Sequence, residues 1–177
     1  NEEESAKGII SLLDQNLNVA YCSDAGTPGV SDPGARLVER VRRESDHPVV
    51  PIPGASAAVT LVSAAGRIGK SFLFEGFLSP KKGRRQKRLE ELLERGDAFI
   101  IYESPFRVLK TLEEIAASGK VERVVVGREL TKAHEEIIAL SPEEMVENFR
   151  ARDAIKGEFA IIVVPGGGRE DADDKED

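Results

Sequence analysis

The apolar residues in the first part of the chain follow two different spacings, one typical of helices and one typical of buried strands. Helical spacing covers residues 9–17, 35–43 and 55–65, whereas short apolar runs cover residues 19–23 and 48–52. Because these runs are bounded by Gly, Pro and Asp, they predict strands. Strands that alternate with helices predict a parallel sheet with helices packed on it.

The rest of the chain predicts a second α/β domain with a mixed sheet. The predicted strands are 72–77, 98–102, 123–127, 136–140 and 159–164, and the predicted helices are 84–94, 106–117 and 142–150. Ser141 is placed to cap the last helix, with Pro142 at its first position. The pattern breaks at Gly66–Ser71, so we expect domains at 1–70 and 71–165, followed by an acidic disordered tail at 166–177.

Composition indicates a globular protein of a reducing compartment, and we expect it in the cytoplasm. Hydrophobic residues make up 40% and charged residues 32% of the chain, no apolar run approaches the ~20 residues of a membrane helix, and no signal peptide is recognised. The single cysteine, Cys22, cannot form an intramolecular disulfide, and with only His47 and His134 beside it there is no cluster at metal-ligand spacing. We therefore expect neither a disulfide nor a metal site. Because the chain opens on Asn1 and a helical pattern follows at once, we also expect a missing upstream segment.

The net charge of −7 argues mildly against a nucleic-acid partner, but the charge is unevenly distributed. Six basic residues fall in eight positions: Lys81, Lys82, Arg84, Arg85, Lys87 and Arg88. Such a run is typical of phosphate contact; the alternative is a solvated helix face balanced by the glutamates that follow. No aromatic residue interrupts the run, so it predicts contact with RNA backbone and shape rather than base stacking.

Two loops rich in small residues follow the first two predicted strands. Residues 23–34 contain three glycines and two prolines, and residues 53–58 open a helix. In open α/β sheets ligands bind beyond the carboxyl ends of strands, so both loops are candidate ligand loops. The alternative is a long turn with Asp32 as a cap, followed by an ordinary tight turn. The Gly66–Ser71 stretch is not a phosphate loop, because it follows a helix rather than a strand.

Three charged turns border the predicted strands of the second domain. They are 102–107, 128–132 and 156–158. Each could form an ordinary surface ion pair worth under about 1 kcal/mol, but three of them beside buried strands favour at least one functional site.

In this order along the chain, residues 23–34, 51–58, 74–78, 102–107, 128–132 and 156–158 resemble the tetrapyrrole-methylase superfamily, and within it the branch that acts on ribosomal RNA. The resemblance implies two α/β domains with S-adenosylmethionine bound in the cleft between them, and an opening strand upstream of Asn1. It also implies a homodimer that methylates a cytidine ribose 2′-hydroxyl in small-subunit (16S) rRNA, free or in the assembled subunit.

The resemblance implies a set of cofactor-binding residues by position. They are Asp24, Ala25, Gly26, Val30, Ser56, Ala57, Tyr102, Glu103, Leu130, Thr131 and Gly157.

Methyl transfer to a ribose hydroxyl is an in-line displacement that also needs a proton acceptor, either a positioned carboxylate or a lysine of lowered pKa. We expect Glu103, Glu129 and Lys132 as catalytic candidates, with Arg107 and Arg128 orienting phosphate. A tetrapyrrole C-methyltransferase on the same scaffold, or a non-catalytic RNA-binding module, remains the alternative.

Overall fold

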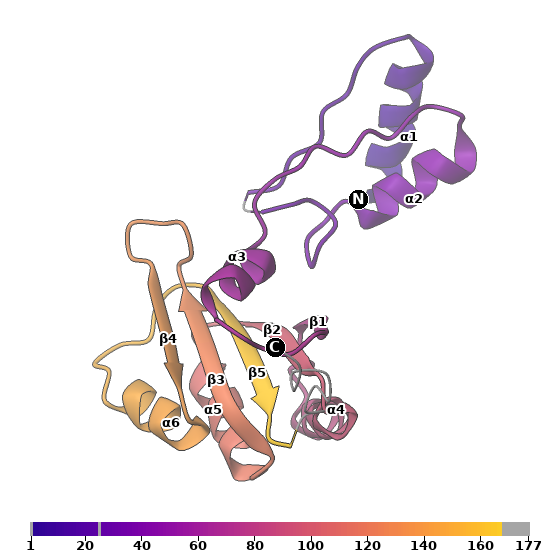
Figure 1. Ribbon diagram of the computed structural model, residues 1–177. Helices are drawn as coiled ribbons and strands as arrows, with labels where there is room; N and C mark the ends of the chain where they lie inside the picture. Colours follow the sequence, from indigo (N-terminus) through magenta and orange to yellow (C-terminus); the bar gives the residue numbers. More distant parts are fainter. Residues whose placement is uncertain (1, 25, 168–177) are drawn as a thin grey trace, which may run out of the picture. The chain divides into compact units, whose positions relative to one another are not determined.

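The computed structural model describes residues 2–24 and 26–167, which fall into two compact units, Asn1–Ser56 and Ala57–Asp177 (Figure 1). Ala25 and the predicted acidic tail from residue 168 onward lie outside the described residues. The Gly66–Ser71 stretch lies within the second unit, where Arg123 Nη1 donates to the Ala65 carbonyl at 3.1 Å and Nη2 to the Arg67 carbonyl at 2.5 Å.

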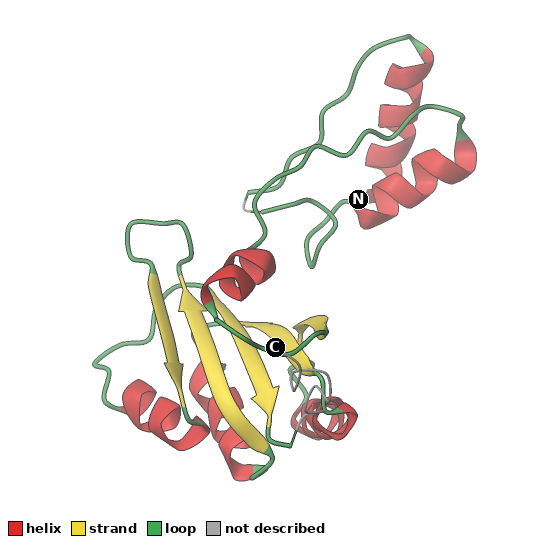
Figure 2. Ribbon diagram, in the orientation of Figure 1, coloured by secondary structure: helices red, strands yellow, loops and turns green. Residues whose placement is uncertain are grey.

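The first unit contains two helices, α1 (Glu2–Asp14) and α2 (Ala35–Glu44), which pack against each other. The two predicted strands of this unit, 19–23 and 48–52, are wrong for the described residues: both segments are loops (Figure 2). A strand exists only when its backbone is paired, and neither segment has a strand partner here. Their apolar side chains stay uncovered, with Val50 71% and Ile52 77% exposed.

The second unit is built on one five-stranded sheet with the order β1-β2-β5-β3-β4. Only the β1–β2 pair is parallel, while β2–β5, β5–β3 and β3–β4 are antiparallel, so the predicted mixed sheet is confirmed. The strands are β1 (Phe72–Phe77), β2 (Ala98–Glu103), β3 (Val121–Arg128), β4 (Glu136–Leu140) and β5 (Phe159–Pro165). The helices are α3 (Ala57–Ala64), α4 (Lys82–Arg95), α5 (Val108–Ala117) and α6 (Pro142–Arg150).

Both faces of this sheet are buried. Successive side chains of the central strands point to opposite faces, so neighbouring residues enter different cores. Phe99 and Ile101 of β2 join the core under α4, α5 and α6, whereas Ala98 and Ile100 join the core under α3 (Figure 1). This alternation sends neighbouring residues at the end of β2 to different sides of the sheet.

The start of α6 confirms the predicted N-cap. The Ser141 hydroxyl accepts from the Glu144 backbone N–H, and the Glu144 carboxylate accepts from the Ser141 backbone N–H, which together form a capping box. Hydrogen bonding to Ser141 lowers the pKa of the Glu144 carboxyl.

Candidate functional site

The predicted charged turns of the second unit meet at one edge of its sheet. Glu103 at the end of β2 and Arg128 at the end of β3 both pair with Phe159 at the start of β5. Tyr102 pairs in turn with Phe77 at the end of β1. The segments 102–107, 128–132 and 156–158 are therefore neighbours in space, although about 50 residues separate the first from the last.

Tyr102 fastens the first turn of α3 to this edge. Its hydroxyl accepts a hydrogen bond from the Ala58 backbone N–H at 3.1 Å, and its ring makes edge contacts with Phe74 at 5.1 Å and Phe77 at 5.7 Å. The first helical N–H groups have no partner within a helix, so the phenol satisfies one of them. The contact places the predicted residue Ala57 next to the end of β2.

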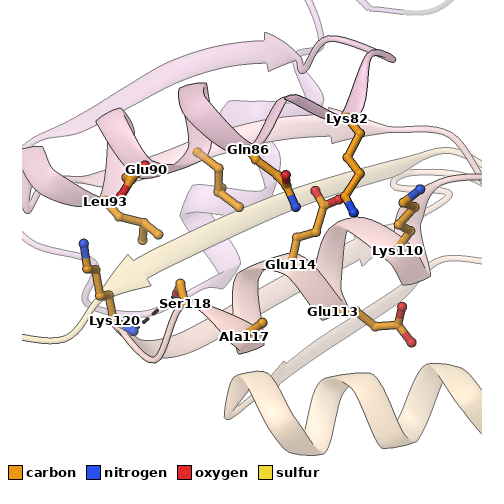
Figure 3. Close-up of a pocket in the computed structure, with 11 residues that line it drawn as sticks. Lys82, Gln86, Glu90, Leu93, Lys110, Glu113, Glu114, Ala117, Ser118 and Lys120 are labelled. Atoms are coloured by element: carbon orange, nitrogen blue, oxygen red, sulfur yellow. Dashed lines mark hydrogen bonds between the residues drawn. The ribbon is translucent and has the colours of Figure 1, made fainter. Parts of the chain in front are cut away.

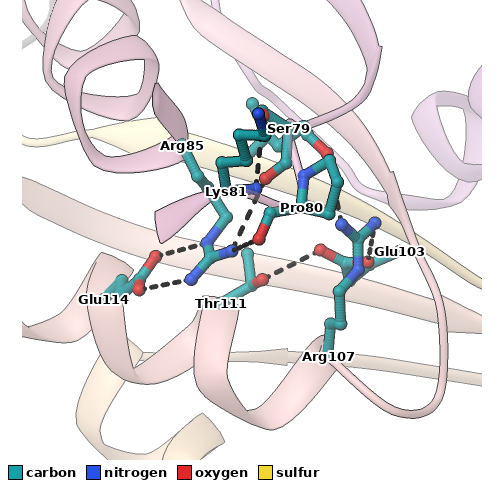
Figure 4. A network of polar contacts seen from close by, with 9 residues as sticks. Ser79, Pro80, Lys81, Arg85, Glu103, Arg107, Thr111 and Glu114 are labelled. Carbon is teal, nitrogen blue, oxygen red and sulfur yellow. Dashed lines mark hydrogen bonds and ion pairs between the residues drawn. The ribbon is translucent and has the colours of Figure 1, made fainter. Parts of the chain in front are cut away.

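Glu103, the next residue, points to the opposite side and is buried in the helical layer (Figure 4). Its Oε1 accepts from the Ser104 backbone N–H at 2.8 Å and pairs with Arg107 Nη2 at 2.7 Å. Its Oε2 accepts from the Thr111 hydroxyl at 2.9 Å. With both oxygens engaged and the side chain 0% exposed, this carboxylate holds the turn that follows β2.

Glu129, Lys132 and Glu158 form a second charged cluster at the same edge. Lys132 Nζ donates to Glu129 Oε1 at 3.1 Å and to Glu158 Oε2 at 2.8 Å. The Glu158 backbone N–H donates to Glu129 Oε1 at 2.8 Å and, with Lys132, lowers the pKa of the Glu129 carboxyl. Hydrogen bonds to Glu158 and then Glu129 raise the pKa of Lys132. The lowered lysine pKa that the sequence suggested is therefore wrong for Lys132, because two carboxylates stabilise its charged form.

Two glycines make this packing possible. Gly157 has φ +100°, and a Cβ there would lie 2.6 Å from Glu129 Cγ. At Gly127 a Cβ would lie 2.9 Å from side-chain carbons of both Leu61 and Leu130. Leu130 therefore folds back over β3, and its two neighbours Glu129 and Thr131 take positive φ values of 48° and 65°.

In the first unit the two predicted ligand loops contact each other. The Thr27 hydroxyl donates to the Ala55 carbonyl at 2.9 Å, and the Ser23 hydroxyl donates to the Gly26 carbonyl at 2.9 Å. Among the predicted cofactor residues, Asp24, Gly26 and Val30 are exposed and Ser56 is half-buried, whereas Ala25 is outside the described residues. Asp32 does not cap α2, which begins after Gly34 without a side-chain cap.

The predicted RNA-binding residues divide into two groups of four. The first group is exposed and, within the described part of the chain, makes no ion pair: Lys81, Lys82, Arg84 and Lys87. The second group is paired with carboxylates: Arg85, Arg88, Arg107 and Arg128.

Arg85 is the most buried of these cations, at 3% exposed. Its Nε and Nη2 make two 2.7 Å hydrogen bonds to Glu114, which raise its pKa, and its Nη1 donates to the Pro80 carbonyl at 3.2 Å (Figure 4). Arg88 is held by Glu75 at 2.7 Å and by Glu91 at 3.0 Å, which likewise raises its pKa. Arg85 therefore braces the 78–81 loop from inside and does not belong to the exposed basic surface.

A groove of about 460 Å³ runs between α4 and α5 (Figure 3). Lysines and glutamates both line it, including Lys82, Lys110, Glu113 and Glu114. Its walls come from the helical layer and Lys120 rather than from the strand-end turns. The groove is therefore separate in composition from the cluster at the sheet edge.

No group of three or more His, Cys, Asp or Glu is arranged to hold a metal ion in the part of the chain that the structure describes. In the same residues, none of the helices has both the length and the apolar character needed to cross a bilayer.

Comparison with known proteins identifies the family of the chain. The profile of the Tetrapyrrole (Corrin/Porphyrin) Methylases matches residues 1–146. The chain belongs to this methylase family, as its sequence motifs predicted.

Within this family, the chain is similar to methyltransferases of ribosomal RNA. The chain is 43% identical over 163 residues to ribosomal RNA small subunit methyltransferase I of Borrelia garinii subsp. bavariensis, covering 92% of this chain and 72% of the relative. Proteins of the same name from Bacillus subtilis and Haemophilus influenzae are 40% and 41% identical, with 99% and 92% of this chain covered. The chain spans only 59% and 58% of the length of those two relatives.

Solved structures support the fold alone. The methyltransferase CobJ matches with a TM-score of 0.68 at 18% identity, covering 91% of this chain and 70% of CobJ. Uroporphyrin-III C-methyl transferase from Thermus thermophilus, solved with S-adenyl homocysteine, matches with a TM-score of 0.59 at 16% identity, covering 90% of this chain and 72% of that protein.

Sequence reasoning missed several residues that shape the site. Thr111 and Glu114 bind Glu103 and Arg85 from α5. Glu158 lies in the predicted 156–158 turn but was given no individual role, and it completes the cluster around Lys132. The first two occupy one face of the helix that follows the 102–107 turn, three residues apart. A polar threonine on the apolar face of a predicted helix was the available signal.

Proposed function

We propose that this chain forms part of an S-adenosylmethionine-dependent methyltransferase whose substrate is small-subunit ribosomal RNA, with the ribose 2′-hydroxyl of a cytidine in 16S rRNA as the acceptor. One observation carries the proposal: three relatives with 40 to 43% identity over most of this chain are all named ribosomal RNA small subunit methyltransferase I. We place the proposed chemistry at the turns that gather at the sheet edge.

Several residues at this edge of the sheet support the proposal of a methyl-donor site. Leu130 provides an apolar surface over β3, Thr131 is an exposed hydroxyl beside it, and Gly157 allows the Glu129 side chain to approach its backbone closely. Together with Tyr102 and Ala57, they form the part of the proposed cofactor set that this unit carries. In the first unit the proposed cofactor residues are Asp24, Gly26, Val30 and Ser56. When bound, S-adenosylmethionine supplies an electrophilic methyl carbon on a cationic sulfur.

In the reaction, the ribose oxygen forms a bond to the methyl carbon, the carbon–sulfur bond breaks with its electron pair on sulfur, and the hydroxyl proton is released. Positioning of the reacting atoms supplies most of the rate. Glu129 remains the proposed proton acceptor, because its carboxylate belongs to the charged cluster at the sheet edge. Lys132 orients it, and buried Glu103 acts as a positioning residue for the 104–107 turn.

Transfer of a labelled methyl group from S-adenosylmethionine to rRNA, in the full-length protein, tests the proposal. A 2′-O-methyl group blocks alkaline cleavage at its nucleotide, so the label should appear in an alkali-resistant dinucleotide that begins with cytidine. Free 16S rRNA and assembled small subunits are assayed in parallel. Absence of label from both RNA substrates refutes the proposed activity.

A matched pair of variants tests the assigned acceptor. Glu129→Gln should lower the transfer rate by about 10²- to 10⁴-fold, the usual contribution of a general base. Glu122→Gln, at the opposite end of β3 and exposed, should leave the rate unchanged. Equal rates in the two variants remove Glu129 from the mechanism without touching the proposed substrate.

The two alternatives predict different results. A tetrapyrrole C-methyltransferase would label a porphyrinogen and not rRNA, but the tetrapyrrole methyltransferases with a similar fold share only 15 to 18% of their sequence with this chain. A non-catalytic RNA-binding module would bind rRNA without measurable affinity for S-adenosylmethionine by calorimetry.

We also propose, from the family resemblance, that the protein is a cytoplasmic homodimer. Light scattering after size exclusion measures the mass directly, and a monomer mass at micromolar concentration would contradict the dimer.

A further inference from the structure

Phe106 is the most exposed large apolar side chain recorded among the described residues, at 96% exposed. It lies in the turn between β2 and α5. Single exposed apolar residues are common on protein surfaces, so exposure alone assigns no role. What distinguishes Phe106 is the rigidity of its turn and the charge of its surroundings.

The turn that carries Phe106 is fixed from both ends. The backbone N–H groups of Arg107 and Val108 donate to the Ser104 carbonyl at 3.1 and 3.0 Å. The buried Glu103 carboxylate holds the Ser104 backbone and the Arg107 guanidinium. An aromatic ring displayed on a braced turn loses little conformational entropy when a ligand binds it.

The same turn is bonded to the loop that leads into the exposed basic residues. Arg107 Nη1 donates to the Leu78 carbonyl at 3.4 Å, which ties the turn to the 78–81 loop (Figure 4). Lys81 ends that loop, and Lys82 and Arg84 begin α4. All three are exposed and make no ion pair within the described residues.

We infer that this surface, Phe106 with Lys81, Lys82 and Arg84, binds a single-stranded RNA segment, with one unstacked base on the Phe106 ring and the flanking phosphates on the basic side chains. The inference rests on the proposed function and specifies how its substrate is recognised. Base stacking on an aromatic ring needs a base that is not already paired and stacked in a helix. If the surface bound a protein instead, its contact with RNA would not depend on whether the bases are paired.

The chain contains no tryptophan, which allows a direct test. In a Phe106→Trp variant, a single-stranded RNA oligonucleotide should quench the tryptophan fluorescence, and the same oligonucleotide annealed to its complement should not. Phe72→Trp is the control, because Phe72 is also an exposed phenylalanine, at 44%. It begins β1, about 16 Å along the strand from Phe77, which pairs with Tyr102 near the turn that carries Phe106. Equal quenching of the two variants, or equal quenching by duplex, overturns the inference.

Affinity provides an independent readout. Phe106→Ala should weaken binding of the single strand about 5- to 150-fold, the range of one lost base stack, with an unchanged salt dependence. Lys82→Gln should instead lower the slope of log affinity against log salt by about 0.7, the value for one phosphate contact on a single strand. Wild-type affinity in Phe106→Ala overturns the stacking role.

Failure of this inference and failure of the proposed function are distinguishable. If Phe106→Ala binds single-stranded RNA like the wild type while labelled methyl still enters rRNA, the inference fails and the activity stands. If Phe106→Trp is quenched by the single strand and the wild type binds RNA as expected but transfers no methyl group, the RNA surface stands and the proposed activity fails.

Discussion

Arg84 and Arg85 are neighbours in one basic run, yet the structure predicts opposite consequences when each is replaced. Arg84 is exposed and without an ion pair in the described residues, whereas Arg85 is buried and joined to Glu114 by two 2.7 Å hydrogen bonds. Replacement by methionine keeps an unbranched chain about as long as the aliphatic part of arginine and removes the charged guanidinium group. Arg85→Met should therefore destabilise the fold, and Arg84→Met should weaken RNA binding.

The magnitude follows from what Arg85→Met leaves behind. Breaking a buried ion pair costs about 3 to 5 kcal/mol, because the remaining charge stays without compensation. Glu114 is 11% exposed and borders the groove between α4 and α5, so it can partly rehydrate. We therefore expect the lower end, about 3 kcal/mol, which lowers Tm by roughly 6 to 12 °C in a chain of this size. The Pro80 carbonyl also loses its donor.

Urea titration, thermal denaturation and RNA binding at several salt concentrations measure these effects. Adding Glu114→Leu to Arg85→Met should recover most of the lost stability, because an apolar pair of similar volume tolerates burial. Arg84→Met should change the free energy of unfolding by less than about 0.5 kcal/mol and lower the salt slope by about 0.7. If Arg85→Met melted with the wild type and lost RNA affinity as Arg84→Met does, the bracing role of Arg85 would be refuted.

Three further predictions concern the sheet edge and α6. Gly157→Ala and its control Gly119→Ala both place alanine at positive φ and should each cost about 1 to 3 kcal/mol of stability. Only Gly157→Ala should displace Glu129 and raise its pKa in an NMR titration. An unchanged Glu129 titration in Gly157→Ala would contradict the close contact between Gly157 and Glu129. Ser141→Ala should destabilise the protein by about 1 kcal/mol in urea through loss of the cap, and an unchanged midpoint would speak against it. Because the pKa of Glu129 is lowered in the folded protein, ionised Glu129 stabilises the fold. The stability difference between wild type and Glu129→Gln should therefore be fully present above pH 4.5 and vanish as pH falls through the lowered pKa. A stability difference that grew in acid would contradict a lowered pKa.

The second unit could be predicted from the sequence because its pattern and its pairing agree. The predicted strands 72–77 and 136–140 and the helix 142–150 have the bounds of β1, β4 and α6. The runs at 19–23 and 48–52 have the same apolar character, but a strand depends on a partner backbone that no local pattern reveals. The apolar character of these two runs therefore predicted that they are buried. In the described structure they are not.

Side-chain roles at the site were harder to predict than the elements that carry them. A run of basic residues does not reveal which member turns inward, since burial of Arg85 depends on Glu114, 29 positions away in the chain. Likewise, the strand-end placement of Glu103 suggested a reactive carboxylate, whereas Thr111 and Arg107 occupy both its oxygens. Position along a strand predicts the edge at which a residue lies, but the facing helix decides what its side chain can do.

The end of β2 links the two halves of the proposed chemistry through the alternation of a strand. Tyr102 and Glu103 are adjacent in sequence, so their side chains leave the sheet on opposite faces. Tyr102 binds the start of α3 on the side of the proposed donor site, while Glu103 fixes the turn that displays Phe106 on the side of the proposed RNA surface. A displacement of this strand end would therefore move both sets of residues together, and two neighbouring side chains are enough to keep a donor site and an RNA surface in a constant relation within this unit.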